Sequence, residues 1–126
     1  MTNDEAKSRG FDLEERTTRF GEAVVLFAKK IPVNFVMTPL IPQFVRAATS
    51  VGANDLEADE ADSRKDFRYR IGLARREARE TKHQLRMVAA EPQLREEARV
   101  LWQEAKELNL IFGAIRCRGD ASPTSE

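Results

Sequence analysis

Residues 63–88 read SRKDFRYRIGLARREARETKHQLRMV, and this stretch decides the fold of the chain. Its apolar positions recur at steps of four and three, which is the spacing of one face of an α-helix. These positions are Phe67, Ile71, Ala74, Ala78, Thr81, Leu85 and Val88. Ser63 stands directly before the pattern as the expected N-cap, and Asp66 completes the cap. The stretch therefore predicts a long amphipathic helix that packs against other helices.

The residues before this stretch predict two more helices. The first extends over about Leu13–Lys30, and Pro32 ends it. The second has two alternative starts, Thr38–Pro39 and Ile41–Pro42, because proline is tolerated only in the first turn of a helix. We expect this second helix to end near Ala58.

A fourth helix is predicted after the amphipathic one. Pro92 is placed to be its first residue, and apolar residues at helical spacing continue to about Arg116. A chain of 126 residues has the length of one domain. The prediction is an all-α fold, an antiparallel up-down-up-down four-helix bundle over residues 12–116. Residues 1–11 and 117–126 are expected to be disordered.

Composition and charge exclude several classes of protein. The chain has 21 basic and 21 acidic residues, so its net charge of zero does not by itself favour nucleic acid or a membrane surface. Cys117 is the single cysteine, which excludes a disulfide framework and favours a reducing compartment. The N-terminus resembles neither a signal peptide nor a transit peptide, and no apolar run is long enough to span a bilayer. We therefore expect a soluble, cytoplasmic protein without a membrane partner.

A narrow polar stripe follows the second predicted helix. Its five residues fall within roughly 80° of one another at about 100° per residue. They are Gln43, Arg46, Ser50, Asn54 and Glu57. The rest of this helix is almost free of charge, so we expect the polar stripe to be partly buried. It is either a structural network that fixes the register of neighbouring helices or subunits, or a ligand or nucleic-acid site. In an antiparallel hairpin, Arg46 would lie near the level of Glu77 and Glu80, which are its expected partners.

A basic face follows the amphipathic helix. Between Arg64 and Arg86 there are nine basic residues and three acidic ones. The basic face consists of Arg68, Arg75, Arg79, Lys82 and Arg86. Such a row can follow a phosphate backbone, because each contact releases counterions. It can equally be a solvated face that pairs with acidic residues of a neighbouring subunit.

No residue pattern indicates catalysis or metal binding. His83 is the only histidine and has no second ligand near it in sequence. Cys117 has no base partner, so a nucleophilic role is not expected. Gly72 and Gly113 are isolated within helices and are interpreted as marks of close helix packing rather than a phosphate loop. We therefore expect no enzyme activity, cofactor, metal ion or small-molecule substrate.

The second and third predicted helices together resemble a known family. The order Gln-x-x-Arg-Ala-x-x-Ser-x-x-x-Asn-x-x-Glu from Gln43 to Glu57, followed by Asp66–Phe67, Ala74 and Glu80, resembles the four-helix-bundle proteins encoded in intervening sequences of bacterial large-subunit ribosomal RNA genes. The resemblance implies a ribosomal-protein-like helical bundle, a homopentamer and no known enzymatic activity. A related branch comprises the accessory proteins of diversity-generating retroelements, in which a basic pentamer binds nucleic acid and a reverse transcriptase.

Two functional hypotheses follow from the sequence. In the first, a non-catalytic oligomer binds structured RNA or a ribonucleoprotein through the basic face. In the second, the oligomer is purely structural or protein-binding and has no nucleic-acid role. Both expect a homo-oligomer, because Leu73, Met87 and Tyr69 lie off the core face of their helix and need a covering surface.

Overall fold

The computed structural model describes the backbone of residues 3–121 and the side chains of residues 12–118. Four α-helices make up most of it: α1 (Asn3–Ala28), α2 (Leu40–Asp59), α3 (Arg64–Val88) and α4 (Arg95–Ala121). A short 3₁₀ turn, η1 (Pro92–Leu94), precedes α4. The described residues contain no strand, so the predicted all-α class is confirmed.

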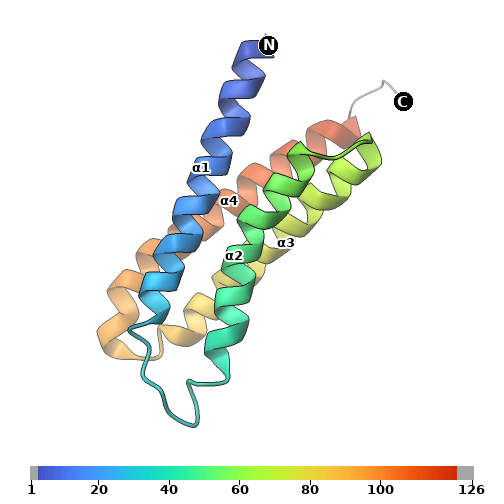
Figure 1. Cartoon of the computed structure of the whole chain (residues 1–126). Coiled ribbons are helices and arrows are strands. Elements are labelled where there is room, and N and C mark those ends of the chain that lie inside the picture. The colour runs from blue at the N-terminus through green and yellow to red at the C-terminus, as the bar shows by residue number, and fades with distance from the viewer. Residues whose placement is uncertain (1–2, 122–126) are drawn as a thin grey trace.

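Consecutive helices lie side by side (Figure 1). The helix α2 packs against both α1 and α3, and α3 packs against α4, whereas α1 and α4 touch more sparingly. The connection between α1 and α2 and the turn that contains η1 lie at one end of the molecule. The start of α1 and the end of α4 lie toward the opposite end.

The helix starts have clear local causes. Ser63 Oγ accepts a hydrogen bond of 3.1 Å from the backbone N–H of Asp66, which is the predicted cap of α3. The helix α2 uses the earlier of its two possible starts, because Pro39 occupies its N-cap position and Pro42 lies within its first turn. Pro92 begins the η1 turn rather than the α-helix itself, which starts three residues later at Arg95.

The terminal helices are longer than expected. The helix α1 begins at Asn3 and α4 continues to Ala121, so both helices extend beyond the predicted bundle boundaries at residues 12 and 116. Once a helix is nucleated, each further residue adds one backbone hydrogen bond at little cost. The packed parts of α1 and α4 can therefore nucleate the further helical turns at their ends. Residues 1–2 and 122–126 lie outside the described residues.

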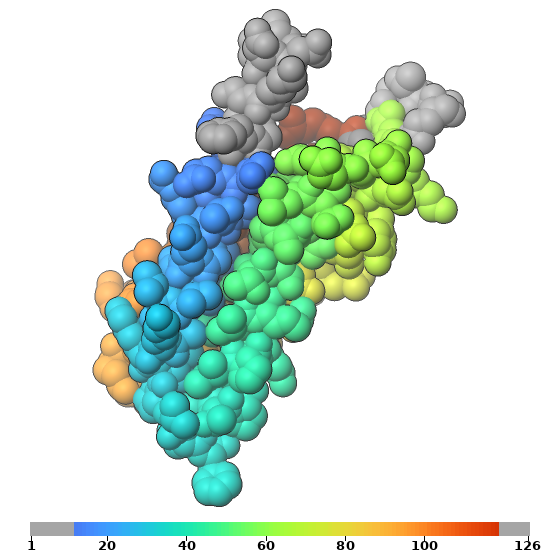
Figure 2. All heavy atoms as spheres, in the orientation of Figure 1, coloured from blue at the N-terminus to red at the C-terminus, as the bar shows by residue number. Residues whose placement is uncertain are grey.

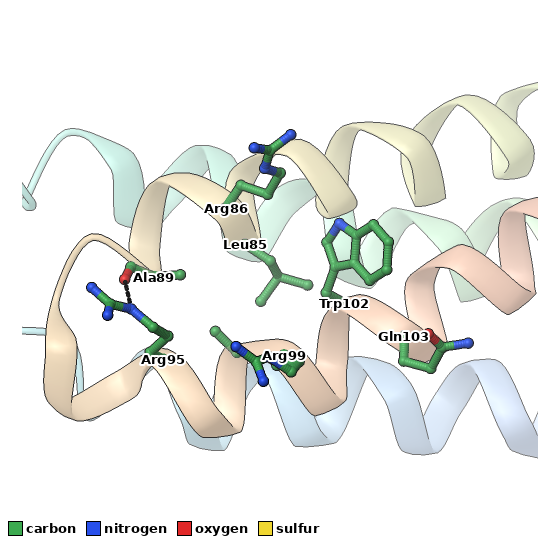
Figure 3. A pocket seen from close by; sticks show the side chains of 8 residues that line it. Leu85, Arg86, Ala89, Arg95, Arg99, Trp102 and Gln103 are labelled. Atoms are coloured by element: carbon green, nitrogen blue, oxygen red, sulfur yellow. Dashed lines mark hydrogen bonds between the residues drawn. The ribbon is translucent and has the colours of Figure 1, made fainter.

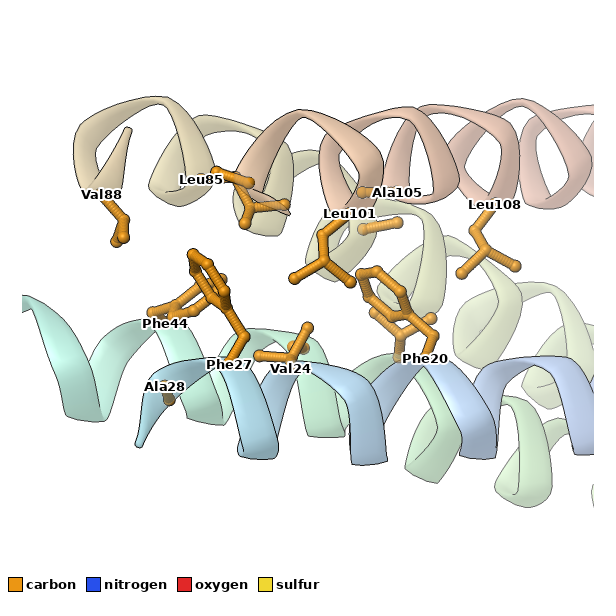
Figure 4. Packing of buried hydrophobic residues seen from close by; sticks show 14 of the residues in the cluster. Phe20, Val24, Phe27, Ala28, Phe44, Leu85, Val88, Leu101, Ala105 and Leu108 are labelled. Atoms are coloured by element: carbon orange, nitrogen blue, oxygen red, sulfur yellow. The ribbon is translucent and has the colours of Figure 1, made fainter. Parts of the chain in front are cut away.

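The core lies between the four helices and is filled by aromatic and aliphatic side chains (Figure 4). Phe27 of α1 and Phe44 of α2 meet edge to face, with ring centroids 6.0 Å apart. The predicted core face of α3 is buried from Ile71 to Val88, while Phe67 at its start is only half-buried. Among the described residues, no helix is long and apolar enough to cross a membrane.

Candidate nucleic-acid interface

The polar stripe of α2 does not form a partly buried network. Gln43, Arg46 and Glu57 are exposed, and only Ser50 and Asn54 are half-buried. Asn54 Nδ2 donates a hydrogen bond of 2.9 Å to the backbone carbonyl of Ser50 on its own helix. The expectation of partial burial was therefore wrong for three of the five residues, because other residues, such as Phe44 and Val51, form the buried side of α2.

Arg46 nevertheless has the predicted partners. Its guanidinium lies 3.0 Å from both carboxylate oxygens of Glu80 and 3.2–3.3 Å from those of Glu77. The hydrogen bonds to Glu80 and Glu77 raise the pKa of Arg46. The Arg46 side chain is 54% exposed and that of Glu77 is 14% exposed, so the pair lies at the surface with the acid partly covered.

A buried carboxyl group lies elsewhere on α2. Asp55 is only 3% exposed, and its Oδ2 has no hydrogen-bond partner among the described residues. Burial, together with the nearby charges of Asp59 and Glu14, raises the pKa of Asp55 to about 7. The sequence carries one signal for this site, which was not among the predicted site residues: between Pro42 and Ala58, Asp55 is the only acid outside the polar stripe.

The basic face of α3 is largely open to solvent. Arg68, Arg75, Arg79 and Arg86 are exposed, whereas Lys82 is half-buried, with its Nζ 5.4 Å from the centre of the Trp102 ring. Within the part of the chain whose side chains are described, Arg75, Arg79 and Arg86 form no ion pair. These three guanidinium groups are therefore available to an external anion.

The charges of α3 are separated by side. Its two central acids, Glu77 and Glu80, are held by Arg46 of α2, which leaves the flank toward α4 basic. Arg16 and Arg19 of α1 and Lys30 just after it have acidic partners instead, as in the pairs of Arg16 with Glu104 (2.7 Å) and Lys30 with Glu97 (2.9 Å). Within the described residues, a chain of zero net charge thus carries a surface on which Arg75, Arg79 and Arg86 have no acidic partner.

Arginines cross between α3 and α4 in a reciprocal pattern. The guanidinium of Arg116 lies 3.4 Å from the point where a Cβ on Gly72 would stand, and Arg75 Nε lies 3.6 Å from the corresponding point on Gly113. Asn109 Nδ2 also donates a hydrogen bond of 3.0 Å to the Arg75 carbonyl. Side chains rather than backbone therefore face these two glycines. The interpretation that Gly72 and Gly113 mark close helix packing is corrected accordingly, because arginine side chains occupy the space beside both glycines.

The basic surface continues onto α4. Arg95, Arg99, Trp102 and Lys106 follow one another at steps of four, three and four, so they share a face of α4. Lys106 Nζ lies 5.5 Å from the Trp102 ring centre. The basic face predicted from the sequence did not include these α4 residues. Their helical spacing was the signal for this extension that the sequence contained.

Among the described residues, no group of three acidic, histidine or cysteine residues could hold a metal ion.

Comparison with known proteins identifies relatives of this chain. The model of the family described as 23S rRNA-intervening sequence protein matches residues 11–113. A crystal structure from Bacteroides thetaiotaomicron, described as a protein of unknown function from the S23 ribosomal protein family, is 28% identical in sequence. It superposes with a TM-score of 0.75, over 85% of this chain and 96% of the other. None of the curated proteins compared with this chain matches it.

Proposed function

Because the chain belongs to the 23S rRNA-intervening sequence protein family, we propose that it is a non-catalytic protein that binds structured RNA through the basic face of α3. The observation that carries this proposal is the separation of charge on α3. Arg46 pairs with both acids on one flank, whereas on the other flank Arg75, Arg79 and Arg86 are exposed and form no ion pair with any residue whose side chain the structure describes. A cytoplasmic location, where ribosomal RNA is found, is part of the proposal.

The length of the basic face fits several successive phosphates. Arg68 and Arg86 are eighteen residues apart, which is about 27 Å at a rise of about 1.5 Å per residue. Arginine donates in a planar fork that matches phosphate oxygens. A row of such contacts fixes position on the RNA without reading its bases. We therefore expect binding that depends weakly on sequence.

The direct test is a binding titration with a structured RNA fragment at several salt concentrations. Each phosphate contact contributes roughly 0.7–0.9 to the steepness of log K against log salt, so three to five contacts predict a slope of about −2 to −4.5. An affinity that is flat in salt would contradict backbone binding by the basic face. If the gene for this chain lies inside a ribosomal RNA gene, that position would independently support the RNA-binding proposal.

The helices are proposed to run up-down-up-down, each antiparallel to the next. Paired contacts between α1 and α2 support this arrangement: a Cβ on Gly52 would lie 3.3 Å from Thr17 Oγ1, and one on Gly21 would lie 3.9 Å from Thr49 Cα. Residue numbers thus rise on α1 as they fall on α2. The two arginine–glycine contacts described above support the same relationship for α3 and α4.

An oligomer, with the pentamer of the resembling family as the expected state, is the second part of the proposal. A largely apolar groove of about 580 Å³, the α1–α2 groove, lies between those two helices, on the face that Figure 2 presents. Val25, Leu26 and Leu56 line it, with exposed fractions of 37%, 61% and 45%. Such apolar exposure favours a covering subunit. It also supports the alternative function, a purely structural or protein-binding oligomer.

A further inference from the structure

A pocket opens between the last turn of α3 and the first turns of α4 (Figure 3). We call it the α3–α4 pocket. Its volume is about 450 Å³, which is within the range of roughly 300–1,000 Å³ typical of small-molecule sites. Leu85, Ala89 and Ala98 contribute apolar surface to it. An aromatic or apolar group could therefore leave water here.

Three arginines line the α3–α4 pocket. Arg86 comes from α3, and Arg95 and Arg99 come from α4. Arg95 Nε donates a hydrogen bond of 3.3 Å to the carbonyl of Ala89, which holds Arg95 beside the opening. Arg86 and Arg99 form no ion pair within the part of the chain described, and no acidic residue lines the pocket. This charge distribution selects an anion.

Trp102 forms one wall of the pocket. Its side chain is half-buried, and the ammonium groups of Lys82 and Lys106 lie 5.4 and 5.5 Å from its ring centre. Aromatic side chains of this kind provide stacking surfaces for nucleobases in proteins that bind single strands. The nearby ammonium groups favour a ligand whose ring is joined to a phosphate, because phosphate oxygens accept charge-assisted hydrogen bonds.

We propose that the α3–α4 pocket binds one unpaired nucleotide, with its base against Trp102 and its phosphate between Arg86 and Arg99. The inference rests on the RNA binding proposed above, because Arg86 belongs both to the basic face and to this pocket. It adds a chemical class of ligand: a planar ring joined to a phosphate, presented at a strand end or bulge. A free nucleoside monophosphate has the same chemistry and serves as the first probe.

The chain contains a single tryptophan, so its intrinsic fluorescence reports directly on this pocket. The protein is titrated with AMP, with adenosine and with inorganic phosphate, with excitation at the red edge of the tryptophan band. AMP is expected to change the fluorescence in a saturable way. Adenosine and phosphate, which each lack one half of the ligand, are expected to bind roughly tenfold more weakly or worse. No response to millimolar AMP, or an equal response to phosphate alone, would overturn the proposal.

Two matched double variants separate this pocket from the rest of the basic face. The variant R86Q/R99Q removes two charges from the pocket and is expected to weaken AMP binding by roughly tenfold or more. The variant R75Q/R79Q removes the same charge from the basic face outside the pocket and is expected to leave the AMP response unchanged. Circular dichroism confirms that both variants fold. Equal AMP affinity in wild type and R86Q/R99Q would contradict the assignment.

RNA substrates then distinguish the two sources of the nucleotide. Fluorescence anisotropy compares a blunt RNA duplex with the same duplex carrying a single-stranded overhang. Tighter binding of the overhang that disappears in R86Q/R99Q supports a nucleotide within a strand. AMP binding without an overhang preference supports the pocket and assigns a free nucleotide to it. If R75Q/R79Q binds blunt duplex as wild type does while AMP still binds, the proposed function fails and the pocket stands.

Discussion

Arg46 Nη2 on α2 lies 3.0 Å from both carboxylate oxygens of Glu80 on α3. Together with the adjacent contact to Glu77, this pair places the negative charge of α3 on its α2 side. On the opposite flank, Arg75, Arg79 and Arg86 are exposed and form no ion pair among the residues whose side chains are described. This surface ion pair therefore matters more for the distribution of charge on α3 than for the stability of the fold.

We expect Arg46→Ala to lower the free energy of unfolding by only about 1 kcal/mol, because exposed ion pairs contribute roughly 0–1 kcal/mol. Urea denaturation measures this change, with Gln43→Ala on the same exposed stripe as the control. A loss of about 3 kcal/mol or more would contradict the surface assignment, since costs of that size belong to buried pairs that lose one partner.

The buried carboxyl group of Asp55 predicts a dependence of stability on pH. Its pKa is raised to about 7 in the folded protein, above about 3.9 for an unperturbed aspartate. Between these values the unfolded chain releases the proton while the folded chain holds it, so stability falls as pH rises from about 4 to about 7. Thermal unfolding at pH 5 and at pH 8 should show the lower melting temperature at pH 8.

The variant Asp55→Asn isolates this effect, because an amide has nearly the same shape and cannot ionise. We expect it to raise stability at pH 8, and to flatten the pH profile by an amount on the order of a few kcal/mol, since one pKa unit corresponds to about 1.4 kcal/mol. Glu57→Gln changes an exposed carboxylate on the same helix and should leave the profile as it is. A profile that keeps its slope in Asp55→Asn would assign the pH dependence to other groups.

Two glycine-to-alanine variants should act in opposite directions. At Gly113 the new Cβ would lie 3.6 Å from Arg75 Nε, which is ordinary contact with a flexible side chain. Alanine should therefore stabilise this helix by roughly 0.5–1 kcal/mol. At Gly52 the Cβ would lie 3.3 Å from the Oγ1 of Thr17, a buried side chain that donates its own hydrogen bond to Glu14 O. Gly52→Ala should lower the melting temperature. A higher melting temperature in this variant would contradict the close contact between Gly52 and Thr17.

The oligomer proposal predicts the behaviour of a variant in the α1–α2 groove. Leu26→Lys with Leu56→Lys places two charges on its exposed apolar rim and should reduce the assembly to a smaller species, because a lysine in a subunit contact would lose its hydration. Multi-angle light scattering measures the mass of wild type and variant. A wild-type monomer at tens of micromolar would exclude the oligomer, and an unchanged mass in the variant would place the interface elsewhere.

The sequence predicted the parts of this molecule that depend on local pattern. The apolar spacing of α3, its Ser63 cap and the pairing of Arg46 with Glu80 all follow from helical geometry, and the structure contains each of them. The burial of the polar stripe could not be derived in the same way. Which face of α2 is covered depends on how α1 and α3 pack around it, and that is a property of the assembled fold.

The α3–α4 pocket shows the same limit more clearly. Arg86 was part of the predicted basic face, but Arg95, Arg99 and Trp102 belong to a different helix. Their spacing on α4 is readable from the sequence, whereas the register that brings them beside Arg86 is set by the turn around η1 and by core packing. Asp55 was visible as an isolated charge, but the absence of a partner for its Oδ2 is a three-dimensional fact.

The measurement that tests the central claim most directly is RNA binding by the charge-reversal variant Arg75→Glu with Arg79→Glu. Its control is Arg19→Glu with Lys29→Glu, which makes the same change in net charge at two exposed positions, one in α1 and one directly after it. Affinity for a structured RNA fragment is measured at low salt, with helicity and oligomer mass recorded for each protein. Binding should be lost in the first variant and retained in the second, with the fold unchanged in both. Equal affinity in wild type and Arg75→Glu with Arg79→Glu would contradict the account.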